Sequence, residues 1–176
     1  MAILLLPLMS LSEGLLTDLK GAIGNSLLCK AVSIKGVPKL PEAAYDKKRE
    51  QYDVERVILF VHEQSKHLSG EKVIAVGNMD LFLGDMSFVF GTAQTSGRIG
   101  LISTYRLDQR FYGKTFSYEK LRDRTVKEAL HELGHCYGLS HCSKDCVMSF
   151  SVNVMEVDSK PRFFCEECRE KLRKAL

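Results

Sequence analysis

Three histidines and one glutamate between residues 131 and 141 have the types and spacing of a metal site that could do chemistry. The segment reads H-E-L-G-H-C-Y-G-L-S-H and contains His131, Glu132, His135 and His141. On a helix, the spacing of four residues places the first two imidazoles on one face, one turn apart. Gly138 stands where such a helix would end, because glycine adopts a left-handed conformation without steric cost, and a turn there can bring His141 back towards the other two.

The chemistry that these residues predict is activation of water by zinc. Three neutral imidazoles on one Zn²⁺ leave a fourth tetrahedral position for water, which is the catalytic rather than the structural arrangement. Such a site can lower the pKa of the bound water to about 7, and Glu132 is placed to take up the proton and pass it on. The short pattern H-E-x-x-H also arises by chance on amphipathic helices, but the added Gly138 and His141 favour a zinc site.

Four of the six cysteines predict a second metal site. They form two pairs, Cys142 with Cys146 and Cys165 with Cys168, and eighteen residues separate the pairs. This spacing is typical of a closed structural zinc site with four thiolate ligands, and the alternative is a metal-free set of reduced core cysteines. Because a lobe of about 40 residues rarely folds without a metal or a disulfide, we expect this site to stabilise residues 139–176.

A strong amphipathic helix over residues 117–138 must position the histidines and Glu132. Its apolar stripe predicts packing against a sheet, with the metal-binding face in a cleft. The stripe consists of Leu121, Val126, Ala129, Leu130 and Leu133, and the polar side of Glu119, Arg122, Asp123, Lys127 and Glu128. We expect the two cysteines outside the pairs, Cys29 and Cys136, to be packing residues.

The rest of the sequence predicts an α/β fold, a mixed twisted sheet with packed helices. The expected strands cover residues 2–8, 31–34, 72–76, 87–91 and 99–106. The expected helices begin at Ser10 or Ser12, lie within residues 45–68 with the charged Lys47, Lys48 and Arg49 at the start, and cover residues 166–176. We expect residues 1–138 to form an N-terminal α/β subdomain with the active-site helix, and residues 139–176 a small C-terminal subdomain, together one compact domain. His62 and His67 are expected at the surface.

Composition and charge limit the classes of function that the chain can have. The chain has 176 residues, 45% hydrophobic and 27% charged, with a net charge of +3, which is typical of one globular domain without a nucleic-acid footprint. No apolar run approaches the ~20 residues of a membrane span. Pro7 interrupts the apolar start and Lys20 is the first basic residue, so we expect neither a signal peptide nor a propeptide, and a cytoplasmic location.

The order of these motifs resembles the archaemetzincins, a branch of the metzincin metallopeptidases. The resemblance rests on His131 to His141, the adjoining Cys142, Cys146-x-Met148 and Cys165-x-x-Cys168, and it covers the whole chain. It implies a zinc-dependent peptidase with two Zn²⁺ per chain, one catalytic and one structural. It also implies that Glu132 is the general base and acid, and that Met148 lies beneath the zinc-binding imidazoles as the Met-turn residue.

Two other functions stay open at this point. One is a zinc-stabilised binding or scaffold protein with a vestigial or occluded peptidase site, against which the intact Glu132 and the three histidines count. The other is a zinc-ribbon nucleic-acid module at the C-terminus, against which three interleaved glutamates count. Its footprint would be Lys160, Arg162, Arg169, Lys171, Arg173 and Lys174. We expect a peptide or protein substrate that lies extended in the cleft beside residues 88–90, with aminopeptidase-like or oligopeptide-directed cleavage. We also expect that the chain has no membrane partner and is a monomer.

Overall fold

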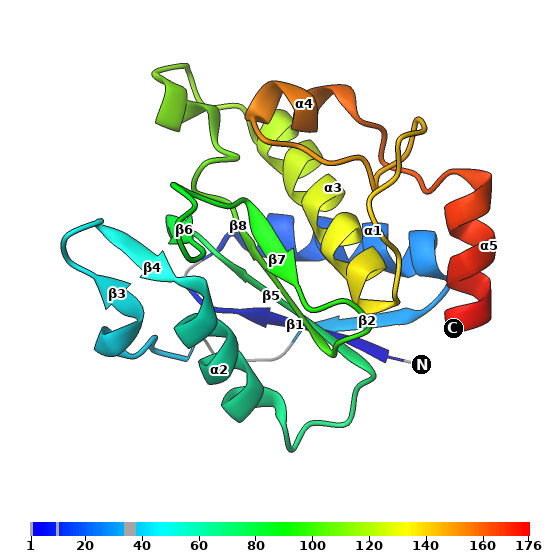
Figure 1. Cartoon of the computed structure of the whole chain (residues 1–176), viewed down its shortest axis with the longest axis horizontal. Helices are drawn as coiled ribbons and strands as arrows, with labels where there is room; N and C mark the ends of the chain where they lie inside the picture. Colours follow the sequence, from blue (N-terminus) through cyan, green and yellow to red (C-terminus); the bar gives the residue numbers. More distant parts are fainter. Residues whose placement is uncertain (1, 10, 34–37) are drawn as a thin grey trace.

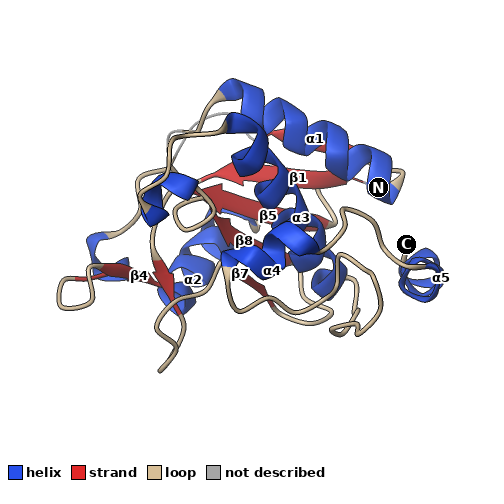
Figure 2. Cartoon of the chain, turned by 90° about the horizontal axis from the view of Figure 1, so that it is seen from above, coloured by secondary structure: helices blue, strands red, loops and turns tan. Residues whose placement is uncertain are grey.

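A five-stranded sheet carries the fold of this computed structural model, which describes residues 2–9, 11–33 and 38–176 (Figure 1). The strand order is β2-β1-β5-β8-β7, in which the first four strands are parallel and β7 is an antiparallel edge strand. Figure 2 shows β1, β5, β8 and β7 side by side in this order. The strands are β1 (Ala2–Pro7), β2 (Lys30–Ser33), β5 (Lys72–Gly77), β7 (Gly91–Ala93) and β8 (Ile99–Ser103).

Helices cover both faces of this sheet, which is why its strands read as nearly continuous apolar runs. In β1, Ile3 and Leu5 belong to one buried cluster and Leu4 and Leu6 to the other, as the alternation of side chains along a strand requires. Helices α1 (Glu13–Leu27) and α3 (Tyr118–Cys136) contribute to the first cluster, and α2 (Val54–Ser65) to the second. The remaining helices are α4 (Val154–Ser159) and α5 (Glu166–Ala175), with 3₁₀ turns at Glu42–Ala44 and Gln109–Tyr112.

Most of the predicted elements are present, with shifted ends. Ser12 is the N-cap of α1, and its hydroxyl accepts a hydrogen bond from the Leu15 amide, while the predicted alternative, Ser10, lies outside the described residues, as does Ile34. Within the part of the chain that the structure describes, no helix has the length and apolar character needed to cross a membrane.

The prediction that the charged residues after Tyr45 begin a helix is wrong. They form a turn between the short strands β3 (Tyr45–Asp46) and β4 (Gln51–Asp53), which belong to a second, three-stranded sheet with β6 (Leu81–Phe82). The Asp46 carboxylate accepts hydrogen bonds from the amides of Lys48 and Arg49, and such side-chain bonds favour a turn over a helix. Helix α2 begins only after Asp53, whose side chain caps it.

The predicted strands over 87–91 and 99–106 also differ from the structure. In the first, Val89 makes only an isolated bridge to Leu81, and the strand β7 begins at Gly91. The second ends at Ser103, whose hydroxyl binds the Met79 carbonyl group and leads the chain into a turn.

Two residues that the sequence pattern placed on the polar side of α3, Lys127 and Glu128, are buried, and so is the neighbouring Arg124. Arg124, Lys127 and Glu128 are 4%, 5% and 4% exposed. Helix α4, which the sequence analysis did not predict, packs over this side, and the Arg124 guanidinium forms two hydrogen bonds with the Asp158 carboxylate at 2.6 and 2.7 Å. Charged side chains that find partners on another segment can be buried without the full desolvation cost.

Candidate active site

Helix α3 presents the predicted site residues at its C-terminal end. The Ser117 hydroxyl caps the start of the helix, and the helix ends at Cys136. Gly138 has a φ of +87° and its amide donates to the His135 carbonyl group at 2.9 Å. This left-handed residue turns the chain sharply, as the sequence predicted.

The turn brings His141 back to the two helical histidines. The ring centroids of His131 and His135 are 4.6 Å apart, and those of His141 lie 5.3 and 4.9 Å from them. One ring nitrogen of each residue lies within 4.8 Å of the others. The three predicted metal-ligating histidines therefore meet at one point in space.

The hydrogen bonds of two imidazoles leave their other nitrogens free for a metal. Nδ1 of His131 lies 2.9 Å from the Val147 carbonyl oxygen, and Nδ1 of His135 lies 2.7 Å from that of Leu139. A carbonyl oxygen only accepts, so both Nδ1 atoms carry the proton and both Nε2 atoms have bare lone pairs. These two Nε2 atoms face each other at 3.1 Å, close to the roughly 3.3 Å separation of tetrahedral ligands about 2.0 Å from zinc. Two facing lone pairs repel, and a cation between the rings removes the repulsion.

The surroundings keep the imidazoles neutral. Burial lowers the pKa of His131 to about 3, and the charge of Lys160 adds to this effect. Burial also lowers the pKa of His135 and of His141. A neutral imidazole is the form that binds a metal, so the three residues fit a zinc ion.

Glu132 lies beside the histidines and is buried, with 4% of its surface exposed. Its Oε2 atom has no hydrogen-bond partner among the described residues. Burial holds the pKa of the Glu132 carboxyl well above its usual range, and the nearby Glu128 carboxylate raises it further. A buried carboxyl oxygen without a protein partner is suited to hold a water molecule or to carry a proton.

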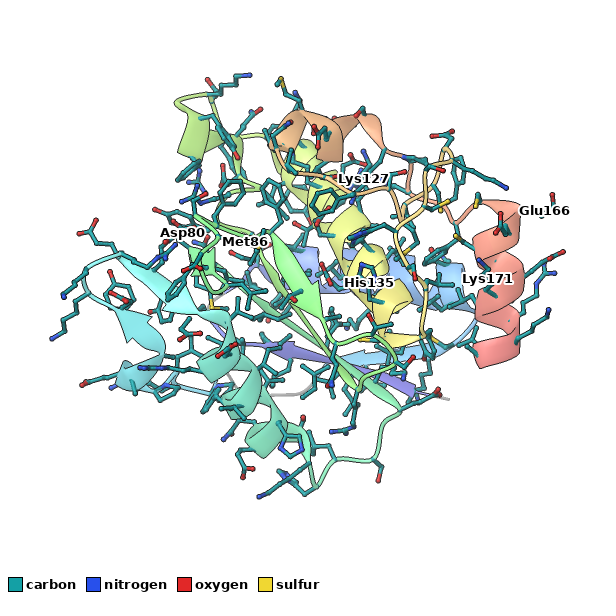
Figure 3. All side chains as sticks on the ribbon, in the orientation of Figure 1. Asp80, Met86, Lys127, His135, Glu166 and Lys171 are labelled. Carbon is teal, nitrogen blue, oxygen red and sulfur yellow. The ribbon has the colours of Figure 1, made fainter. Side chains whose placement is uncertain are left out.

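A cleft of about 560 Å³ opens over these residues. One wall is the segment of residues 86–93, which ends in β7, and the opposite wall includes α3 and residues 150–152. Figure 3 labels His135 on α3 and Met86 on the facing segment. The cleft is large enough for several residues of an extended peptide and leads directly to the three histidines.

Met148 packs against the end of α3 that carries His131 and His135. Its side chain is fully buried, and its sulfur is so close to Gly134 that a Cβ built there would lie 2.3 Å from it. The Met148 carbonyl oxygen accepts a hydrogen bond from the Cys142 amide at 3.0 Å. The residue therefore links the helix that carries two histidines to the segment that carries the third.

The four paired cysteines also meet in the structure. Sulfur atoms of Cys142, Cys146, Cys165 and Cys168 all lie within 4.8 Å of one another, and none forms a disulfide. The Cys142 and Cys165 sulfurs are 3.8 Å apart, the separation of about 3.8 Å expected for thiolates 2.3 Å from a tetrahedral zinc ion. The amides of Met148 and Cys165 donate to the Cys146 sulfur, and such bonds favour thiolates. This cluster also fits zinc.

Other residues singled out from the sequence lie apart from both clusters. His62 and His67 are exposed. Cys136 is fully buried against the sheet, and burial raises the pKa of its thiol to about 12, which makes it unreactive. Of the residues that would form the footprint of the alternative nucleic-acid module, Lys160 is buried, and Arg162 and Lys171 form ion pairs with Asp123 and Glu167.

Sequence reasoning missed two charged residues that line the cleft, Glu128 and Lys160. Glu128 precedes Glu132 by four residues, so helical spacing could have placed both carboxylates on one face. No local signal marks Lys160, because its partner Glu128 lies 32 positions earlier in the chain.

One protein family and several known proteins are similar to this chain. The profile of peptidase family M54 matches residues 29–174. An archaemetzincin from Thermococcus kodakarensis is 34% identical over 99% of this chain and 96% of its own length. Two solved structures are also similar. A zinc-dependent peptidase from Methanocorpusculum labreanum has 30% sequence identity and a TM-score of 0.86, over 97% of this chain and 99% of that one. The archaemetzincin from Methanopyrus kandleri has 32% sequence identity and a TM-score of 0.85, over 99% of this chain and 94% of that one.

The match spans most of the chain, and the relatives are aligned over nearly their whole length, with the same mixed α/β fold. This chain therefore belongs to peptidase family M54 and is a zinc metallopeptidase of the archaemetzincin type.

Proposed function

We propose that the chain hydrolyses peptide bonds at the cleft over α3, with His131, His135 and His141 as ligands of the catalytic zinc and Glu132 as general base and acid. The observation that carries the proposal is the meeting of three neutral imidazoles beside a buried carboxyl oxygen that has no partner among the described residues. The zinc ion would supply polarisation of the scissile carbonyl group and a water of lowered pKa.

Glu132 performs both proton transfers in this proposal. One carboxylate oxygen takes a proton from the attacking water and later delivers it to the leaving amine nitrogen. A raised pKa suits the second step, because a weaker acid holds the proton until the amine needs it. Met148, packed against Gly134, supports the helix end that carries His131 and His135.

The substrate is a peptide or protein segment that lies extended along β7. This strand is the edge of the main sheet, and its residues 91–93 line the cleft, so it can pair with a substrate backbone. This position is three residues further along the chain than the sequence analysis expected. We propose oligopeptides as substrates, with aminopeptidase-like trimming as one mode, and a labelled N-terminal residue distinguishes trimming from internal cleavage.

The second zinc ion in this proposal is structural and is held by Cys142, Cys146, Cys165 and Cys168. Four thiolates close its coordination sphere, so that it stabilises residues 139–176 as a small lobe behind the N-terminal subdomain of residues 1–138. The chain acts as a monomer in the cytoplasm, where reduced thiols persist.

Substitution of Glu132 tests the catalytic assignment. Glu132→Ala is expected to keep its zinc, because the three imidazoles are untouched, and to lose peptide cleavage by about 10²- to 10⁴-fold. The measurement pairs metal analysis per chain with cleavage of a peptide library. His62→Ala, at an exposed position outside the cleft, is the matched control and is expected to leave activity unchanged. Full turnover by zinc-loaded Glu132→Ala would contradict the assignment.

A further inference from the structure

A buried ion pair extends the cleft beyond the residues that the peptidase mechanism uses. Lys160 Nζ lies 2.8 Å from Glu128 Oε1, and the two side chains are 3% and 5% exposed. Both line the same cleft as the three histidines. Glu128 lies one helical turn before Glu132, so the pair is on the side of Glu132 away from His135.

The Lys160 ammonium keeps hydrogen-bonding capacity for a ligand. It has three N–H donors, and its one side-chain hydrogen bond among the residues described is to the Ser149 carbonyl oxygen at 3.5 Å, because Glu128 Oε1 forms an ion pair with it without hydrogen-bond geometry. At least one N–H is therefore left without a partner in that part of the chain. The ammonium therefore offers a hydrogen-bond donor to the cleft, beside a Glu128 carboxylate whose Oε1 atom has no hydrogen-bond partner among the described residues.

The neighbouring segment holds Lys160 in place. Two residues before it, Asp158 accepts two hydrogen bonds from the buried Arg124 guanidinium. Lys127 Nζ donates to the carbonyl oxygens of Val157 and Asp158 at 3.1 and 2.9 Å. A cation fixed in this way loses little conformational entropy when it binds a ligand.

Part of the cleft lining is apolar. Met86, Phe150 and Val152 line the cleft and are 50%, 57% and 56% exposed. A ligand that suits apolar walls beside an ammonium donor carries a carboxylate at the end of a hydrocarbon chain.

From this arrangement we infer that Lys160 is a specificity-determining residue that binds a carboxylate of the substrate close to the scissile bond. The carboxylate comes from an acidic side chain or from the free C-terminus of a short peptide. The inference rests on the proposed function in one respect, since it takes the cleft to be a peptide site. Glu128 positions the lysine and does not touch the substrate.

A binding experiment separates this inference from hydrolysis. The full chain, zinc-loaded and carrying Glu132→Gln so that peptides are not consumed, is titrated with fluorescent peptides that contain Glu or Gln at one position in turn. Each peptide has either a free or an amidated C-terminus. We expect one carboxylate to bind at least about tenfold more tightly than its amide counterpart, as charge-assisted hydrogen bonds do. The Glu/Gln pairs and the acid/amide pairs tell the two sources apart.

The decisive variant removes both charges of the pair. Lys160→Met alone would leave the Glu128 carboxylate buried without its counter-ion, which destabilises the fold. Lys160→Met is therefore combined with Glu128→Gln. In this double variant the ratio of the affinities for the carboxylate and amide peptides is expected to fall to about one. Lys160→Arg keeps the cation and is expected to keep the preference. Lys144→Met removes an exposed lysine of the same lobe, 61% exposed, and is expected to change nothing.

Two results would overturn the inference: no carboxylate preference in the parent protein, or a preference that survives in the double variant. Cleavage by the protein with Glu132 intact is measured separately on the best-bound peptide. Lys160-dependent binding without cleavage would refute the proposed function and leave the carboxylate site standing. Cleavage without a carboxylate preference would refute only the role of Lys160.

Discussion

Gly91 approaches Glu132 so closely that a Cβ built on the glycine would lie 3.0 Å from Oε1 of the carboxyl group. The same Cβ would lie 2.7 Å from the Leu101 carbonyl oxygen of the neighbouring strand β8. Gly91 is the first residue of the edge strand β7, whereas Glu132 belongs to α3. The missing side chain is what lets the strand, the helix and the carboxyl group meet at one point.

Gly91→Ala is therefore expected to lower kcat/KM by about tenfold to a hundredfold while zinc binding is kept. The added methyl group must displace either Glu132 or the edge strand, and a shift of about 1 Å near reacting groups can cost a hundredfold in rate. Peptide cleavage and metal analysis measure the two effects. Gly21→Ala, where nothing lies within 4 Å of the new Cβ, is the control. Activity equal to that of the control would show that Glu132 does not need this position.

Gly134→Ala tests the contact between α3 and Met148. Alanine normally stabilises a helix relative to glycine by up to about 1 kcal/mol. At position 134 the new Cβ would lie 2.3 Å from a sulfur whose side chain is fully buried, so we expect a loss of about 1–3 kcal/mol in the free energy of unfolding. Urea unfolding measures this change in the free energy of unfolding. The control is Gly21→Ala in the middle of α1, which is expected to raise the free energy of unfolding. A stabilised Gly134→Ala protein would mean that Met148 is free to move.

Asp158→Asn tests the attachment of α4 to α3. The hydrogen bonds from Arg124 lower the pKa of the Asp158 carboxyl below its ordinary value of 3.8. A lowered pKa means that the stabilisation is present above pH 3.8 and is lost as the pH falls through the folded-state value. Asp158 is 38% exposed, and solvent screens the pair, so the substitution is expected to cost about 1–2 kcal/mol at pH 7.

The difference between Asp158→Asn and the unchanged protein is then expected to shrink as the pH falls below about 3.8, because the Asp158 carboxylate becomes protonated. Urea unfolding at several pH values measures it. Glu167→Gln, which removes an exposed carboxylate from two ion pairs, should change stability by less than about 0.5 kcal/mol. A difference that grows on acidification would contradict the role of the Arg124 pair.

The parts of the fold that could be predicted are those that depend on neighbouring residues. The spacing of His131 and His135, the left-handed Gly138 and the apolar runs of the strands each act within one or two turns of chain, and the structure has the helix, the turn and the strands at these places. The four cysteines could be paired because two short C-x₂₋₃-C segments set their own geometry.

The parts that could not be predicted depend on partners far along the chain. Arg124 and Lys127 look like solvent-facing residues of α3, and only α4, more than 25 positions away, shows why they are buried. The place of Lys160 in the cleft also depends on a distant partner, since its counter-ion Glu128 lies 32 positions earlier in the chain. The sequence predicts that the charged stretch after Tyr45 begins a helix, but the Asp46 side chain accepts hydrogen bonds from the amides of Lys48 and Arg49, and the residues on either side of this turn pair in a second sheet.

Cys165→Ser tests the number and the roles of the metal sites. We expect the zinc content to fall from two ions to one per chain, because a hydroxyl group does not replace a thiolate ligand, and we expect the loss of the structural ion to unfold residues 139–176 more easily. Cys29→Ser, at a partly buried thiol outside both clusters, is the control and should keep two ions. A chelator should remove the histidine-bound ion first, since three imidazoles hold zinc less tightly than four thiolates. Metal analysis measures the zinc content per chain, and limited proteolysis measures how easily residues 139–176 unfold. Two zinc ions per chain in Cys165→Ser would refute the assignment of Cys165 as a ligand of the structural zinc.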